Sequence, residues 1–343
     1  MPCPRSWASR RSSPATGPWC SASPSIWAGA SPTTASRCRA GRAGSARPSS
    51  LPPPLLLYPT WYDPYRDRLC PLEDAMAALT AETRAWRDDH RGWVATGMRL
   101  WKRKPLQDVF GQTTKLRFEG RPARAVARAR AEGRRLMVWA GKTTAELDAA
   151  GAVRIEDGFL RSRGLGADLV PPLSLVLDDL GIYYDPTRPS RLEHLIAAAA
   201  RDRPALARAR AARLVQTLTT ASLSKYNLAA ASLPDPLPEG YKILIPGQVE
   251  DDASIRLGTG AIRSNRALLL AARQAHPQAV LLYKPHPDVE AGLRDGQVPD
   301  AAQIADLILP RTDPIAAIAA ADAVWTLTST LGFEALIRGK PVT

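Results

Sequence analysis

The sequence predicts an α/β protein that contains two doubly wound, parallel-sheet units. Apolar runs of strand length alternate with runs of helix length over residues 122–222 and again over 241–339. This alternation is typical of parallel strands that are joined by helices. Residues 233–240 contain three prolines and one glycine, which indicates a linker between the two units.

Composition places the chain among globular proteins and argues against a membrane span, a nucleic-acid partner, a metal site and a disulfide framework. No run approaches the ~18 apolar residues that a membrane span needs. The formal net charge is +13, but seven of the positive charges are arginines in residues 1–62, which contain no Asp, Glu or Lys. Elsewhere no Lys/Arg block is interleaved with aromatics, so a nucleic-acid partner rests on charge alone. The four cysteines form no Cys-x-x-Cys pair, so we expect no metal site and no disulfide framework.

Residues 1–54 show no hydrophobic period. We interpret them as a disordered or out-of-frame segment, because they offer little patterned apolar surface to offset the entropy of ordering. A signal peptide would need a continuous apolar centre, which is missing here. A transit peptide stays open as an alternative, since the segment is rich in Arg and Ser and lacks acids.

The pattern of the first unit predicts its elements in order. A helix is expected over 73–101, followed by the basic cluster Lys102–Lys104, which we interpret as a solvated helix end rather than a membrane-surface patch. Residues 105–120 look like a linker. Ser190 and Glu193 form a capping-box pattern. The further strands expected are 136–140, 151–155, 173–177 and 181–184, and the further helices 122–132, 144–150, 191–200 and 204–222.

The second unit repeats this alternation. Gly339 is the expected C-cap of its last helix. Because the chain stops about where another strand should begin, we expect this unit to be C-terminally incomplete. The strands expected are 241–246, 279–283, 307–309 and 323–327, and the helices 262–275, 314–321 and 330–338.

Two acidic loops follow expected strands. Glu156 and Asp157 end the strand 151–155, beside Gly158, which allows unusual backbone angles, and Arg161. Open α/β sheets place their chemistry at the carboxyl ends of strands. The alternative is a surface turn with a solvated Arg–acid pair. A second run of acids, 250–252, follows the strand 241–246, and there the alternative is solvated or helix-capping acids.

A phosphate-type site is indicated by two further strand ends. Lys284 and His286 lie in Lys-Pro-His-Pro, where flanking prolines restrict the backbone, and both suit a phosphate oxygen. Ser329 and Thr330 follow the strand 323–327 at the start of a helix, where free N–H groups bind phosphate; ordinary N-capping is the alternative. Glu334 on that helix is expected to reach a ribose or base. Together these loops suit a two-Rossmann (GT-B) glycosyltransferase that uses a nucleotide-activated sugar.

Five motifs of the sequence are specific in combination: Glu156–Gly166, Pro172–Pro186, Ser224–Leu228, Lys284–Pro287 and Gly332–Thr343. They closely resemble those of the KpsC/LipB family of capsule polysaccharide biosynthesis proteins. The resemblance covers roughly residues 55–343. Family members carry two transferase modules in tandem, so the resemblance implies that 55–104 is the helical tail of a preceding module. It further implies that 105–236 is the N-terminal Rossmann-like unit and 237–343 the C-terminal, donor-side unit.

This resemblance implies a retaining transferase that moves β-Kdo from CMP-Kdo by double displacement. Asp252 would be the nucleophile, because Gln248, Asp252 and Ser254 fit the family's Gln-x-x-x-Asp-x-Ser pattern. Asp157 would be the acid/base, supported by Glu156. Arg161 would hold the Kdo carboxylate. CMP would be bound by Gln248 and by the strand-end residues Lys284, His286, Ser329, Thr330 and Glu334, with neither metal nor other cofactor.

The resemblance also implies the cellular setting. The acceptor would be a lipid-linked Kdo oligosaccharide, and the enzyme would be cytoplasmic, peripheral to the inner membrane, beside the capsule assembly and export machinery. An inactive remnant that binds nucleotide or a partner without catalysis is the alternative, and nucleic-acid binding is a third hypothesis.

Overall fold

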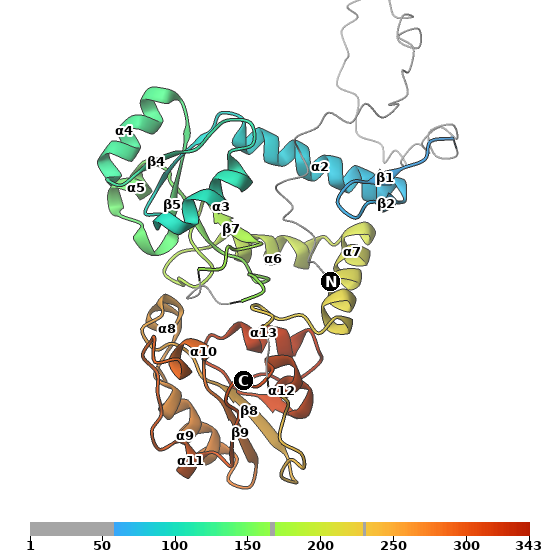
Figure 1. Ribbon diagram of the computed structural model, residues 1–343, viewed down its shortest axis with the longest axis vertical. Coiled ribbons are helices and arrows are strands. Elements are labelled where there is room, and N and C mark those ends of the chain that lie inside the picture. The colour runs from blue at the N-terminus through green and yellow to red at the C-terminus, as the bar shows by residue number, and fades with distance from the viewer. Residues whose placement is uncertain (1–57, 165–168, 229–230) are drawn as a thin grey trace, which may run out of the picture. The chain divides into compact units, whose positions relative to one another are not determined.

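The computed structural model describes residues 58–164, 169–228 and 231–343 (Figure 1). The chain divides into two compact units, residues 1–88 and 89–343. In the described part of the first unit, β1 (Tyr62–Asp63) pairs antiparallel with β2 (Arg68–Leu69), and α2 (Leu72–Asp89) follows. The expectation for residues 1–54 lies outside the described residues.

The larger unit contains two sheets, and the first has the order β4-β3-β5-β6-β7. Its strands pair in parallel, except that β7 runs antiparallel to β6 at the edge. The strands are β3 (Trp93–Thr96), β4 (Arg117–Glu119), β5 (Arg135–Trp139), β6 (Val153–Asp157) and β7 (Leu175–Asp178). The helices between them are α3 (Leu100–Phe110), α4 (Pro122–Glu132) and α5 (Ala145–Ala149).

Helices cover both faces of this sheet, because side chains alternate along each strand. Val94, Leu136 and Val138 pack in one cluster with residues of α4 and α5. Trp93 and Met137 point to the other face and pack with residues of α3. Strands that are buried on both faces explain the continuous apolar runs in the sequence.

The second sheet has the order β10-β9-β8-β11, with all pairs parallel. One face packs against α9 (Asn265–Ala275) and α11 (Ala301–Ile304), and the other against α12 (Pro314–Ala320) and α13 (Thr330–Leu336). The strands are β8 (Lys242–Pro246), β9 (Val280–Lys284), β10 (Leu307–Ile308) and β11 (Ala323–Val324). The predicted α/β class with two Rossmann-like sheets is confirmed.

Several element boundaries agree with the sequence. Helix α4 has the predicted bounds, and Gly133 ends it in the left-handed conformation with φ of 60°. The capping box of Ser190 and Glu193 is present at the start of α6 (Arg191–Arg201), which α7 (Ala205–Thr220) follows. Val342 forms an isolated parallel bridge with Val324 of β11.

The expected helix over 73–101 is wrong, because β3 and the start of α3 lie within that range. Trp86, Trp93 and Leu100 are spaced by seven residues, which imitates a helical period, whereas β3 is buried on both faces and shows no alternation. Since β3 pairs with β4 and β5, the first sheet begins at Trp93 rather than after residue 104.

Two further expectations fail. Residues 105–120 are not a linker, because α3 continues through Pro105 to Phe110 and β4 follows. Pro105 resembles a helix boundary in the sequence but lies inside the helix. Residues 181–184 form a turn instead of a strand. They follow the edge strand β7, which pairs only with β6.

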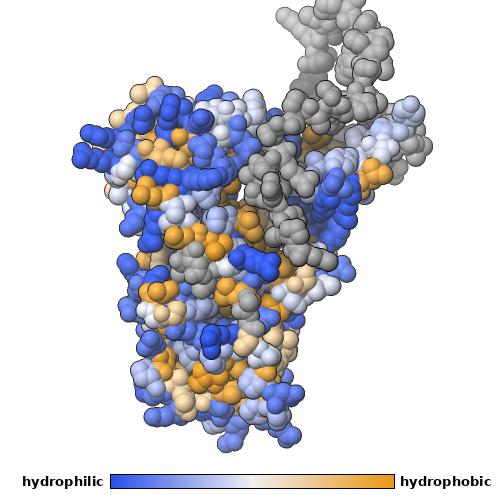
Figure 2. Space-filling view, in the orientation of Figure 1, coloured by the Kyte–Doolittle hydropathy of each residue, from blue (hydrophilic) through white to orange (hydrophobic). Residues whose placement is uncertain are grey.

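None of the helices in the described part of the chain combines the length and the apolar composition that a membrane span requires. On the face shown in Figure 2, apolar residues occur in small groups between charged ones. Large exposed apolar side chains include Leu195 and Ile196 of α6.

Truncation of Met137 should destabilise the larger unit strongly. Met137 is 0% exposed in β5, so Met137→Ala removes buried contacts and leaves a cavity, which costs about 2–5 kcal/mol. Met76 in α2 is 53% exposed, and Met76→Ala is the matched control with an effect near zero. Urea unfolding followed by circular dichroism measures both; equal midpoints for the two variants would contradict the assigned core.

Candidate active site

Each sheet has a topological switch point, where successive connections leave in opposite directions. In the first sheet it lies between β3 and β5, and in the second between β8 and β11. Ligands of open α/β sheets bind at the carboxyl ends of the strands beside such points. The loops after β8 and β11 lie beside the switch point of the second sheet, where this rule expects a site. The acids of β6 also lie at a carboxyl end, one strand away from the switch point of the first sheet.

The acids at the end of β6 form a buried charge cluster. Arg161 is 2% exposed, and its Nε donates to Oδ2 of Asp157 over 2.9 Å. Its Nη1 donates to Ser162 Oγ over 2.8 Å, while Nη2 is buried and makes no hydrogen bond within the described residues. The alternative of a solvated surface pair is therefore wrong. Nη2, which makes no hydrogen bond within the described residues, remains available for the predicted role of Arg161 in holding a carboxylate.

Lys102, which the sequence placed in a solvated cluster, is a further member of this site. It is 9% exposed, and its Nζ lies 3.7 Å from Oδ1 of Asp157. Burial lowers the pKa of the Lys102 ammonium, while the charges of Asp157 and Glu156 oppose this shift. Sequence reasoning missed it because the neighbouring Arg103 and Lys104 made the segment look like an exposed basic end.

Glu156 has the protonation behaviour of a group that can exchange protons near neutrality. Burial raises its pKa to about 7, and the adjacent charge of Asp157 adds to the rise. The Asp157 N–H, which donates to Glu156 Oε1 over 2.9 Å, opposes the rise, as do the charges of Lys102 and Lys225. A group whose pKa lies near the working pH is well suited to general acid–base catalysis.

Gly158 is required by close packing rather than by an unusual backbone angle. It is not among the described residues with positive φ. A Cβ at this position would lie 3.0 Å from the Ser174 carbonyl carbon and closer still to Ser174 Oγ. The Gly158 N–H also donates to Ser174 O over 2.9 Å. The reason we gave for this glycine from the sequence is therefore wrong, although the glycine itself is essential to the turn.

Tyr183 lies against the acidic end of β6. Its Oη donates to the Asp157 carbonyl oxygen over 3.5 Å, and its ring packs on Phe159 and Tyr184. Burial raises the pKa of both phenols, and the charges of Glu156 and Asp252 add to the rise in each.

The loop after β8 is held by Gln248. This buried side chain donates from Nε2 to Thr328 Oγ1 and accepts at Oε1 from the Thr328 N–H, each over 2.9 Å. Both of its polar atoms contact the loop after β11, so Gln248 ties the two strand ends together. The nucleotide contact predicted for it from the sequence stays a prediction.

The three acids of this loop have different surroundings. Glu250 accepts from the Asn265 N–H, and Asp251 pairs with Arg294 over 2.6 Å. Asp252 is exposed and caps α8 (Ala253–Gly258), accepting at Oδ1 from the N–H and hydroxyl of Ser254. The capping alternative is thus right for Asp252, whose Oδ2 makes no hydrogen bond within the described chain.

His286 is a neutral donor rather than a cation. Burial lowers its pKa to about 4, against the opposing charge of Asp288, and the charges of Lys225 and Lys284 reinforce the lowering. Its Nδ1 accepts from the Asp288 N–H over 3.1 Å, so the neutral ring carries its proton on Nε2. Lys284 is buried and pairs with no carboxylate within the described chain, and burial lowers its pKa.

Ser329 caps α13, accepting from the Leu331 N–H, and Thr330 begins that helix. Both are half-buried. Glu334 is buried and accepts at Oε1 from the Lys225 N–H over 2.8 Å, and burial raises its pKa to about 6. Glu334 therefore supports the backbone of the Lys225 turn. The ribose or base contact expected of it from the sequence stays a prediction.

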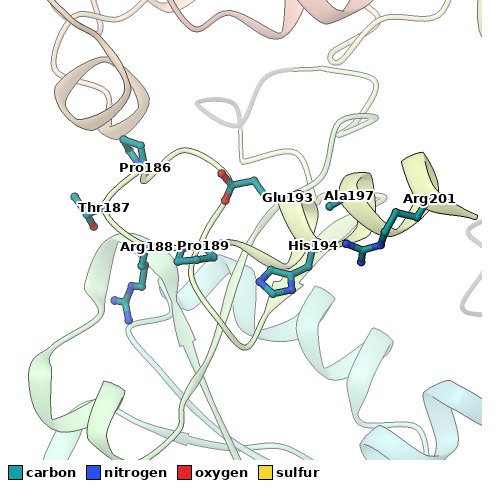
Figure 3. A pocket seen from close by; sticks show the side chains of 8 residues that line it. All are labelled: Pro186, Thr187, Arg188, Pro189, Glu193, His194, Ala197 and Arg201. Atoms are coloured by element: carbon teal, nitrogen blue, oxygen red, sulfur yellow. The ribbon is translucent and has the colours of Figure 1, made fainter.

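A hollow of about 550 Å³ lies elsewhere on the larger unit (Figure 3). Its walls include His194 and Arg201 of α6 and Arg188 of the preceding loop, and none of the sequence-predicted site residues. Among the described residues no group of three His, Cys, Asp or Glu side chains could hold a metal ion.

Comparison with known proteins supplies the biological context. A sequence model of the family described as "Capsule polysaccharide biosynthesis protein" matches residues 137–242 and 225–343. The capsule polysaccharide modification protein LipA of Neisseria meningitidis serogroup A is 41% identical over 254 residues. That alignment covers 72% of this chain and 36% of LipA, so the chain spans about a third of this relative.

Two solved structures are similar in fold and sequence. A Thermosulfurimonas dismutans KpsC structure titled beta Kdo 2,7 transferase superposes with a TM-score of 0.56 at 33% identity, covering 73% of this chain and 77% of that one. The KpsC structure titled beta Kdo 2,4 transferase, from the same organism, gives 0.61 at 30% identity, with coverages of 74% and 79%. These similarities support the GT-B-like class predicted from the sequence.

The raised pKa of Glu156 predicts a pH-dependent stability. The stabilising effect of its neutral carboxyl is fully present below about pH 4.5 and is lost as the pH rises to about 7, because the unfolded chain ionises first. Glu156→Gln lacks this proton, so its stability relative to wild type should increase across that window. Urea unfolding at a series of pH values tests this; parallel stability curves would show that Glu156 titrates normally.

Proposed function

This chain belongs to the family of capsule polysaccharide biosynthesis proteins, and we propose that it forms the catalytic part of a retaining β-Kdo transferase that uses CMP-Kdo. The observation that carries the proposal is the presence of carboxylates at two strand ends: Glu156 and Asp157 end β6, and Asp252 lies in the loop after β8. Two such acidic loops supply what double displacement needs: a nucleophile and an acid/base. The titles of the two similar KpsC structures support Kdo as the sugar.

The proposed reaction has two displacements. The Asp252 carboxylate attacks the anomeric carbon of Kdo as the bond to the CMP phosphate oxygen breaks, which forms a glycosyl ester. The acceptor hydroxyl then attacks the same carbon and gives its proton to the acid/base at the end of β6, freeing Asp252. Two inversions restore the original configuration. The exposed position of Asp252 leaves its Oδ2 accessible to a substrate.

Departure of CMP requires stabilisation of negative charge on its phosphate. His286 offers Nε2–H as a neutral donor, and Lys284 offers a buried ammonium. Ser329 and Thr330 add hydroxyls at the start of α13. Donors that are fixed before the reaction stabilise a leaving group without reorganising, so this set accounts for the step without calling on a metal ion.

The acceptor and setting follow from the same proposal. The acceptor is a lipid-linked Kdo oligosaccharide, and the enzyme works at the cytoplasmic face of the inner membrane beside the capsule assembly and export machinery. These assignments rest on the family resemblance and on the relative described as a capsule polysaccharide modification protein.

A covalent intermediate should be visible by mass. Incubation of this chain with CMP-Kdo should add the mass of one Kdo residue, and peptide mapping should place it on Asp252. Asp252→Ala should abolish the adduct. Asp251→Ala is the matched control, because the neighbouring Asp251 is exposed and paired with Arg294, and it should leave the adduct unchanged.

An adduct that persists in Asp252→Ala but disappears in Asp157→Ala would show that Asp157 is the nucleophile. If this chain forms no adduct while a full-length family member does under the same conditions, the proposal of catalysis fails. The chain would then fit the alternative of a remnant that binds without turnover.

A further inference from the structure

Lys102 has surroundings that its sequence neighbours do not share. Its side chain is 11% exposed, whereas that of Lys104, two residues later on α3, is 82% exposed and pairs with Asp108. A buried ammonium is costly unless opposite charges or aromatic faces replace water around it. The structure provides both for Lys102, so its burial is compensated by specific partners.

Those partners are an aromatic ring and a carboxylate oxygen. Lys102 Nζ lies 3.1 Å from the centroid of the Trp139 ring and 5.2 Å from that of Trp101. It faces Oδ1 of Asp157 at 3.7 Å, an oxygen that is buried and makes no hydrogen bond within the described chain. Arg161 Nε contacts the other oxygen, Oδ2, at 2.9 Å. Each oxygen of Asp157 therefore faces its own cation.

We infer that Lys102 is a positioning residue: together with Arg161 it holds both carboxylate oxygens of Asp157 in place, and it acts on the neighbouring Glu156 as the acid/base of the pair. Only the catalytic part of this inference rests on the proposed transferase function. Removing one member of such a buried charge group leaves the others uncompensated. Lys102 lies on α3, and it acts through its contact with Asp157.

This assignment reverses the roles within the pair that the sequence suggested. Each carboxylate oxygen of Asp157 faces a cation of the protein, Lys102 at one and Arg161 at the other. Glu156 has no cation within ion-pair distance among the described residues. The charged and titratable groups that influence or are influenced by Glu156 are Asp157, Lys102, Lys225, Tyr183 and Tyr184.

The direction of the effect of Lys102 follows from charge. The ammonium lowers the pKa of Glu156, because it stabilises the ionised carboxylate. Lys102→Met removes that charge while keeping a side chain of similar length. The Glu156 transition should move upward from about pH 7, by on the order of one unit for a charge at this range. Lys102→Arg keeps the charge and should leave the transition near its original value.

The experiment is a carboxyl titration by carbon-13 NMR of Glu-labelled protein, with Glu156 assigned by its loss in Glu156→Gln. Lys104→Met is the matched control and should leave the Glu156 titration unchanged. An upward shift in Lys102→Met alone supports the inference. A Lys102→Met titration identical to wild type, or an equal shift in Lys104→Met, overturns it.

A second measurement keeps the test valid if Lys102→Met does not fold. Nitrogen-15 NMR of the lysine ammonium groups in wild type and in Asp157→Asn reports on Lys102 directly. Loss of the Asp157 charge should lower the pKa of Lys102 further, because that charge raises it. An unchanged Lys102 titration would show that the two groups do not interact.

The proposed role of Lys102 in catalysis is tested separately. The pH profile of Kdo transfer should shift upward in Lys102→Met and stay in place in Lys104→Met. If the shifted carboxyl titration is seen but wild type transfers no Kdo, the proposed function fails and the positioning role stands. If wild type transfers Kdo and neither titration shifts, the positioning role fails and the proposed function stands.

Discussion

The site depends on one backbone turn, Ser224–Asn227. The Lys225 carbonyl oxygen accepts from the N–H groups of Arg161 and Ser162, over 2.9 and 3.2 Å, and its own N–H donates to Glu334 of α13. Ser224 and Asn227 close the turn on themselves through mutual side-chain hydrogen bonds. The loop that carries Arg161 and the helix α13, which Ser329 caps, are thus both hydrogen-bonded to the peptide groups of Lys225. Buried peptide groups must be paired, which makes this turn hard to replace.

Much of the fold could be predicted from the sequence, because helix signals are local. The capping box at Ser190 and the glycine at 133 fix helix ends by short-range hydrogen bonds and backbone angles. Strand β3 could not be predicted in this way. Its four residues are buried by α3, α4 and the neighbouring strands, which are contacts that no sequence period encodes.

The residue types of the candidate site could be predicted from the sequence, but the role of each residue could not. Asp157, Asp252 and His286 were found because acids and imidazoles after strands are recognisable chemistry. The structural tasks of Gln248 and Glu334 were not, since each depends on a backbone partner far away in the chain. Lys102 was missed for the same reason: only the fold decides which lysine of a basic cluster is withdrawn from water.

The cross-link made by Gln248 has a thermodynamic consequence for ligand binding. Its amide joins the end of β8 to Thr328 before any nucleotide arrives, and Thr328 Oγ1 in turn contacts Ser254 Oγ, beside Asp252. A loop that is already ordered loses little conformational entropy when it closes on a ligand. The affinity of this loop for a ligand is therefore set mainly by the contacts it makes, and only slightly by the entropy cost of ordering the loop.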